Sequence, residues 1–190
     1  MNFQFPPKKN GEWLKLTAEQ KEKWLNLAYD KCVSKDSGPY IEIPNRTVEI
    51  DGLNIEDELS FYCEIGEAVN GPGGYFGRSF HGFDDCLFGG FGLDFPYKII
   101  WKNFEYSKRH LNDKVLRDWL DELSETDEED AFWLKIRQSW GENAEDFFTV
   151  LVDAITSVSY RNWNGWKVEL ELRSVIRQSN KKPKIEVVGL

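Results

Sequence analysis

The chain is poor in cysteine and histidine, and this shortage argues against two kinds of site. Its 190 residues include three cysteines and two histidines. Cys32, Cys63 and Cys86 are widely spaced and form no Cys-x-x-Cys motif or Cys/His group, so neither a disulfide framework nor a zinc site is indicated. We expect reduced, buried thiols, and neither a metal nor a cofactor.

Positive charge is also scarce, since 24 Lys and Arg residues oppose 33 Asp and Glu, which gives a formal net charge of −9. Nucleic-acid binding depends on clustered Lys and Arg that displace counterions, so no nucleic-acid partner is expected. An acidic protein associates faster with a basic one because complementary fields steer their encounter. The charge balance therefore favours a basic protein partner.

Long apolar runs are absent as well. No stretch reaches the roughly 18 apolar residues of a membrane span, and residues 1–9 lack the charged region and apolar run of a secretion signal. We therefore expect a cytoplasmic protein with no membrane partner. The aromatic content of 15%, with eight Trp, is typical of a packed globular protein.

The rest of the sequence alternates between helical and strand patterns. Apolar residues at helical spacing predict helices over about 17–32, 54–69, 80–88 and 144–158, and a short helix after Trp101. Alternating or short apolar runs predict strands over 40–43, 47–50, 97–101 and 167–172, with 185–188 as a candidate extra strand. Because parallel strands require crossover connections, this order predicts a small parallel sheet of about three strands covered by helices.

Two segments lie outside this order. Residues 1–40 contain the first helix and are expected to dock as an N-terminal helical extension on a main domain of residues 41–190. Within that domain, about 112–143 is an acidic insertion, and 113–130 hold nine Asp or Glu and two Lys or Arg. Such a block is most often solvated, although a basic partner makes it a candidate contact surface too.

Residues 75–87 carry the main functional signal. Phe80, Phe83 and Leu87 fall at i, i+3 and i+7, which predicts a helix seated on the core. This orientation turns four other residues towards solvent: His81, Asp84, Asp85 and Phe88. The segment therefore presents an acidic surface.

The start of this helix has its own signals. Ser79 is at the N-cap position, and Gly77 tolerates the positive φ of a tight turn. The cluster of Gly71, Gly73, Gly74 and Gly77 lacks the Gly-Lys-Ser/Thr of a phosphate-binding loop, so we interpret it as a turn.

The element order and several motifs together resemble the barstar family of ribonuclease inhibitors over residues 47–172. The motifs are Asp51-Gly52 before one helix, Tyr75-Phe76-Gly77 before a second, Asp85 within that helix, Phe95-Pro96 before a strand, and Trp101–Lys108. The resemblance implies an α/β, three-layer barstar-like fold. It also implies a bacterial toxin immunity protein that occludes the basic active site of a ribonuclease-type toxin, one to one.

The resemblance also implies which residues touch that partner. In the family an acidic helix and the loop before it block the active site of the ribonuclease, and a carboxylate of that helix takes the place of the substrate phosphate. Asp85 matches that carboxylate, Tyr75 matches the loop Tyr that stacks on the enzyme, and Asp153 matches an outlying Glu. The predicted partner-binding residues are Tyr75, Phe76, Gly77, Ser79, His81, Asp84, Asp85, Phe88 and Asp153.

Departures from the family pattern predict a different target. His81 replaces a second helix Asp, Ser79 replaces a binding Asn, and Asp84 replaces a Trp. Rearranged charges discriminate between partners, so the cognate toxin is expected to differ from barnase. Asp84 is expected to take over part of the charge lost at position 81.

Other interpretations of these residues stay open. A helix Asp is most often a solvated charge. His81 with Asp84 or Asp85 is also compatible with a small hydrolase, although no Ser or Cys nucleophile with an orienting partner is apparent. A third alternative is a barstar-fold protein without inhibitory activity. Residues 160–166 suit base stacking, although a packed turn is favoured in so acidic a chain. We predict a binding protein and not an enzyme.

Overall fold

A computed structural model of the chain describes residues 3–34, 40–124, 143–162, 164–176 and 184–188. Its four-stranded sheet has the order β1-β2-β3-β4, with bounds β1 (Arg46–Asp51), β2 (Tyr97–Lys102), β3 (Val168–Ile176) and β4 (Lys184–Val188). The first three strands are parallel, and β4 pairs with β3 in the antiparallel sense. The predicted three-stranded parallel sheet and the extra strand are both confirmed.

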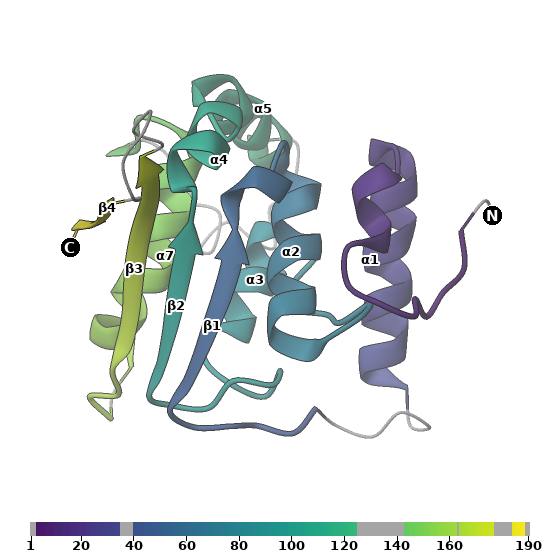
Figure 1. Ribbon diagram of the computed structural model, residues 1–190, viewed down its shortest axis with the longest axis horizontal. Coiled ribbons are helices and arrows are strands. Elements are labelled where there is room, and N and C mark those ends of the chain that lie inside the picture. The colour runs from purple at the N-terminus through teal and green to yellow at the C-terminus, as the bar shows by residue number, and fades with distance from the viewer. Residues whose placement is uncertain (1–2, 35–39, 125–142, 163, 177–183, 189–190) are drawn as a thin grey trace.

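The helices give the molecule its layers. They are η1 (Glu12–Lys15), α1 (Ala18–Val33), η2 (Gly52–Asn54), α2 (Glu58–Asn70), α3 (Phe80–Cys86), α4 (Phe104–His110), α5 (Asp113–Ser124) and α7 (Phe147–Arg161). Figure 1 shows α3 and α7 behind the sheet, α2 beside β1, and α1 beyond α2. The sheet, these three helices and the outer α1 form three layers, so the predicted α/β architecture is confirmed.

Alternation along the strands explains why the helices lie on one face. Val48 of β1 pairs with Ile99 of β2, and Ile50 pairs with Trp101, and all four are buried. The opposite face is mostly polar, although it includes the buried Ile100, and it carries ion pairs such as that between Lys102 Nζ and a carboxylate oxygen of Glu49, 2.8 Å apart. Among the described residues no helix covers this polar face (Figure 1).

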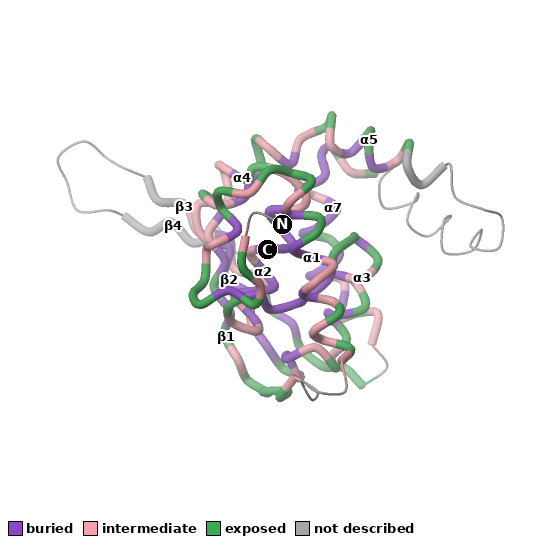
Figure 2. The backbone as a smooth tube through the Cα atoms, turned by 90° about the vertical axis from the view of Figure 1, so that its right-hand side faces the viewer, coloured by how far each residue is buried: buried purple, intermediate pink, exposed green. Residues whose placement is uncertain are grey.

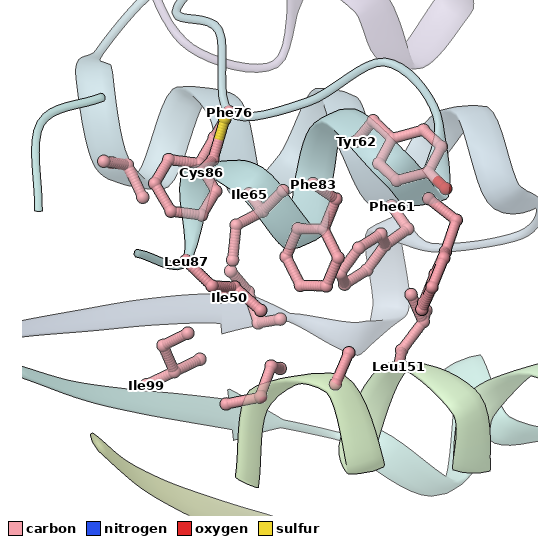
Figure 3. Packing of buried hydrophobic residues seen from close by; sticks show 14 of the residues in the cluster. Ile50, Phe61, Tyr62, Ile65, Phe76, Phe83, Cys86, Leu87, Ile99 and Leu151 are labelled. Carbon is pink, nitrogen blue, oxygen red and sulfur yellow. The ribbon is translucent and has the colours of Figure 1, made fainter. Parts of the chain in front are cut away.

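An aromatic cluster anchors α3 in the core. The Phe61 ring of α2 contacts Phe83 edge-on, with centroids 5.0 Å apart, and stacks on Trp101 at 5.3 Å. Figure 3 shows Phe61 and Phe83 side by side among the core residues. Phe80, Phe83 and Leu87 are all buried, which confirms the predicted apolar stripe.

Two predicted boundaries are wrong. Residues 40–43 form no strand but a single bridge from Ile43 to Leu93, and Ile41 is 81% exposed. Asn45 has a positive φ, which interrupts the extended backbone conformation between this segment and β1. The helix expected from residue 54 begins at Glu58, because residues 52–54 form a separate 3-10 turn and the following Asp57 provides the N-cap.

The acidic insertion is partly structural. Its first part forms α5, whose Leu116 and Trp119 are buried. The Trp119 ring packs on Phe80 of α3 and on Phe147 of α7, with centroids 5.1 and 5.6 Å apart. The interpretation as a solvated block is therefore wrong for the buried side of α5, and residues 125–142 lie outside the described residues.

A buried carboxylate ties the N-terminal extension to the main body. Glu67 of α2 is 4% exposed. Its Oε2 accepts hydrogen bonds from Gly11 N (2.7 Å) and Trp13 Nε1 (3.0 Å), and its Oε1 accepts one from Gly73 N (3.0 Å). Trp24, Leu25 and Ala28 of α1 are buried in the same core. The extension docks as expected, whereas a domain boundary at residue 40 stays a prediction.

Replacing Glu67 with Gln is expected to lower the unfolding free energy by about 1–3 kcal/mol, because an amide nitrogen then faces at least one of the three donors. Burial raises the pKa of Glu67 above its ordinary value of 4.5. The folded state therefore keeps this proton to a higher pH than the unfolded state. Stability from Glu67 is fully present below about pH 4.5 and falls as the pH rises through the folded pKa.

Denaturant unfolding of the parent and Glu67→Gln over a series of pH values checks this. The difference in unfolding free energy should be larger near pH 4 than near pH 7. A difference that grows with pH would contradict the assigned sign. Glu22→Gln, at an exposed position of α1, is a matched control and should stay within about 0.5 kcal/mol of the parent.

Candidate partner-binding surface

A tight turn and an N-cap fix the start of α3. Gly77 has φ +93°, and a Cβ atom there would lie 2.6 Å from the backbone nitrogen of Phe83. Ser79 Oγ accepts a hydrogen bond from Gly82 N at 3.3 Å. Both predicted roles are confirmed, and the turn is folded directly against the helix that follows it.

The exposed side of this helix consists of Ser79, His81, Asp85 and Phe88, which we call the α3 face. His81 Nε2 lies 3.6 Å from Asp85 Oδ2, and 60% of the Asp85 side chain is exposed. Figure 2 shows buried and exposed backbone alternating along α3. The predicted exposure of His81, Asp85 and Phe88 is confirmed. An exposed ion pair contributes little to stability, so redirecting Asp85 towards another cation costs little.

Asp84 does not belong to the α3 face. Its carboxylate forms two hydrogen bonds with Arg161 of α7, from Nη2 to Oδ1 at 2.6 Å and from Nη1 to Oδ2 at 2.9 Å. Only 20% of the Asp84 side chain is exposed. The prediction that Asp84 faces solvent is wrong, because its carboxylate is paired with Arg161. Its expected share of the charge lost at His81 stays a prediction.

The same guanidinium supports the rim of the α3 face. The Arg161 Cζ atom lies 4.8 Å from the centroid of the Phe88 ring. A cation held over an aromatic face is attracted by the ring quadrupole. Arg161 therefore joins α7 to Asp84 and to Phe88 at once.

A double-mutant cycle on Arg161→Ala and Asp84→Ala is expected to give a coupling energy of about 1–2 kcal/mol in the unfolding free energy, because the pair is bidentate and mostly buried. The exposed pair Lys114 and Asp118, one turn apart on α5, is a matched control with an expected coupling of about 0.3–0.5 kcal/mol. Equal coupling in the two cycles would show that burial adds nothing to the Asp84 pair.

Tyr75, Phe76 and Gly77 lie beneath the surface. Tyr75 is 4% exposed and Phe76 is fully buried. The Tyr75 ring contacts Tyr29 of α1, with centroids 5.3 Å apart, and its backbone N–H donates to Tyr40 Oη at 3.0 Å. Burial also raises the pKa of the Tyr75 hydroxyl. The expected exposure of these three residues is wrong, because the N-terminal extension covers Tyr75 while Phe76 and Gly77 pack against Phe83 of α3.

Asp153 lies on a different part of the surface. It is exposed on α7 and lines a groove of about 890 Å³ bounded by α4, α7, β2 and β3. Phe104, Phe148 and Val152 provide apolar lining, and α3 contributes none. Partial burial raises the pKa of the Asp153 carboxyl. Its role in partner binding stays a prediction.

Three residues near α3 were missed in the sequence. The exposed Arg78 has its guanidinium carbon 4.5 Å from the centroid of the Tyr29 ring and donates a hydrogen bond to Asn26 Oδ1. No local pattern signals these contacts, because they join α1 to a turn 52 residues away from Asn26.

The turn favoured for the aromatic segment at the end of α7 is present, but it is packed only in part, since Tyr160 is 90% exposed and Trp166 is 42% exposed. The Trp166 ring stacks on Phe95, with centroids 4.5 Å apart. Asn162 closes the turn, because its side chain donates to Trp166 O at 3.0 Å and accepts from Trp166 N at 2.9 Å. The glycine cluster before α3 is likewise a turn, with positive φ at Gly71 and Gly73.

The described part of the chain offers neither a cluster of metal ligands nor a membrane-spanning helix. No three or more His, Cys, Asp or Glu side chains are grouped there in a way that could hold a metal ion. Of the helices described, none has the length and apolar character needed to cross a membrane. Cys63 and Cys86 are buried free thiols, whereas Cys32 is only half-buried.

The comparisons with known proteins give one match. The model of the family described as barstar, or barnase inhibitor, matches residues 45–152. No curated protein and no solved structure matches the chain. The matched region covers more than half of the chain, from the residue before β1 into α7, and includes the whole α3 face. The chain therefore belongs to the barstar family.

Proposed function

We propose that this protein is an immunity protein that inhibits a basic ribonuclease-type toxin by placing the α3 face in the enzyme's active site, one to one. The single observation that carries the proposal is Asp85, a mostly exposed carboxylate on a short helix whose opposite side is locked into the core. Membership of a family of ribonuclease inhibitors supports the same class of partner.

The rigidity of α3 supports this mode of binding. A carboxylate presented on a fixed helix meets an arginine of a phosphate site bidentately, and little conformational entropy is lost on binding. The packing of Phe83 on Phe61 fixes the buried side of α3, and the Ser79 cap fixes its first turn. The net charge of −9 adds long-range attraction to a basic enzyme.

Within this proposal the residues have separate roles. Asp85 takes the place of a substrate phosphate, His81 and Ser79 set specificity, and Phe88 forms an apolar rim. Asp153 contributes an outlying charge on α7. Tyr75, Phe76 and Gly77 support the α3 face from below.

Catalysis by His81 is the weaker alternative. Catalytic groups act on substrates held in concave sites, and the groove lined by Asp153 includes neither His81 nor Asp85. Asp84 is neutralised by Arg161, which leaves a single carboxylate beside the histidine. We therefore propose a non-enzymatic, cytoplasmic inhibitor that binds neither nucleic acid nor membranes.

Inhibition assays with barnase and a panel of other basic microbial ribonucleases test the proposal. At least one enzyme should lose its RNA hydrolysis at an equimolar ratio, and light scattering should give a one-to-one complex. Its association rate should fall steeply with added salt, because steering acts between charges. If no ribonuclease in the panel is inhibited at micromolar concentration, the proposal fails.

A further inference from the structure

The helix α1 adjoins the turn that leads into α3. Three contacts join them: Tyr29 covers the Tyr75 ring, Arg78 stacks over Tyr29, and Arg78 donates a hydrogen bond to Asn26. The loop surface that Tyr75 would otherwise present is thus replaced by side chains of another helix.

We propose that α1 forms a second half of the partner-binding surface, in which Tyr29 and Arg78 provide the contacts that the buried Tyr75 cannot make. This inference rests on the proposed function. The α1–α3 surface consists of Asn26, Tyr29, Asp30 and Arg78 together with the α3 face. Its occupant is the same basic ribonuclease that receives Asp85.

Helical spacing supports this assignment. Asn26, Tyr29, Asp30 and Val33 fall at i, i+3, i+4 and i+7, so they share one side of α1. Asp30 and Val33 are exposed, and Tyr29 is half-buried. Among the described residues the Tyr29 hydroxyl has no hydrogen-bond partner. A large ring with a polar tip available to a partner is typical of protein interfaces.

The α1–α3 surface carries both exposed carboxylates and a cation. These charges fit a basic enzyme that also has a hydrogen-bond acceptor at the edge of its active site. Asp30 and Asp85 are exposed carboxylates that attract lysine and arginine. Arg78 is a cation at the junction of the two helices, so it requires a carbonyl or carboxylate group on the enzyme at that point. Such a requirement excludes enzymes that are uniformly basic around the active site.

The surface is also held in place before binding. The stack on Tyr29 and the bond to Asn26 restrict the Arg78 side chain, so less rotamer freedom is lost in a complex. On its other side α1 is fixed to α2, where Lys21 Nζ lies 3.0 Å from Asp57 Oδ2. Preorganised tyrosine and arginine side chains are the residue types that most often dominate binding energy.

Affinity measurements on Tyr29→Ala and Arg78→Ala, with a ribonuclease that the parent inhibits, test the inference. Each variant should weaken binding by about tenfold or more. Arg78 is exposed, so its variant tests the surface without disturbing the core. Lys31→Ala is a matched control. Lys31 is two residues after Tyr29, so its side chain projects from the opposite side of α1, and the variant should change affinity less than about twofold.

The possible results separate the two proposals. If Asp85→Ala loses binding while the Tyr29 and Arg78 variants bind like the parent, α1 lies outside the interface and only this inference fails. Tighter binding by Tyr29→Ala would also overturn it, because α1 would then mask Tyr75. If the parent inhibits no ribonuclease in the panel, the proposed function fails, and this inference fails with it.

Discussion

The Asp85→Ala variant is expected to bind an inhibited ribonuclease about 30-fold to about 4,000-fold more weakly than the parent. Removing one partner of a hydrogen-bonded charge pair that is buried in a complex typically costs about 2–5 kcal/mol, and each 1.4 kcal/mol is a factor of ten. The enzyme's phosphate-binding cations would be left buried without a counter-charge. Inhibition constants and dissociation rates of the purified proteins measure the loss.

Two controls separate charge from folding. Asp85→Asn keeps the shape of the side chain but removes its charge, so it should lose most of the same affinity. Asp118→Ala removes an exposed carboxylate of α5 that, like Asp85, pairs with a residue one helical turn before it. It should leave affinity unchanged apart from a small effect of net charge. Inhibition by Asp85→Ala at the parent's potency would remove the central residue of the proposed function.

The Gly77→Ala variant is expected to lose about 3 kcal/mol or more of unfolding free energy. A residue other than glycine at φ +93° is strained by about 1–2 kcal/mol, and the added Cβ would lie 2.6 Å from the backbone of Phe83. Relief requires the turn to move away from α3. The thermal midpoint should fall by about 6–12 °C, and inhibition should weaken as the α3 face loses its position.

Gly90→Ala provides the matched comparison. Gly90 also has a positive φ, +85°, but a Cβ there meets no neighbour within 4 Å. It should therefore show only the conformational cost of about 1–2 kcal/mol. Equal losses in the two variants would mean that the close approach to Phe83 adds nothing.

Local patterns predicted the elements that present the site. The stripe of Phe80, Phe83 and Leu87 indicated which side of α3 is buried, because helical periodicity is a property of neighbouring residues. Ser79 and Gly77 were assigned correctly for the same reason, since capping and positive φ depend on a few adjacent positions. The parallel order of β1, β2 and β3 followed from the spacing of strands and helices.

Errors arose where distant segments meet. Asp84 looked solvent-facing because its partner, Arg161, is 77 residues away at the end of α7. Tyr75 looked available because the helix that covers it, α1, lies outside the part of the chain that resembles the family. The composition of the acidic insertion concealed Leu116 and Trp119, whose burial depends on α3 and α7. Side-chain pairing between elements has no signature in a single sequence.

The polar face of the sheet, opposite the helices, gives an attachment point for biophysical probes. Thr47 is exposed on β1. Because side chains alternate along a strand, it points to the face opposite that of its buried neighbour Val48. Figure 1 shows α3 on the other side of the sheet. A dye or surface linker carried by Thr47→Cys would therefore leave the α3 face unobstructed, and the native thiols are buried or half-buried. Tethered this way, every molecule would present the same side to a ribonuclease in solution.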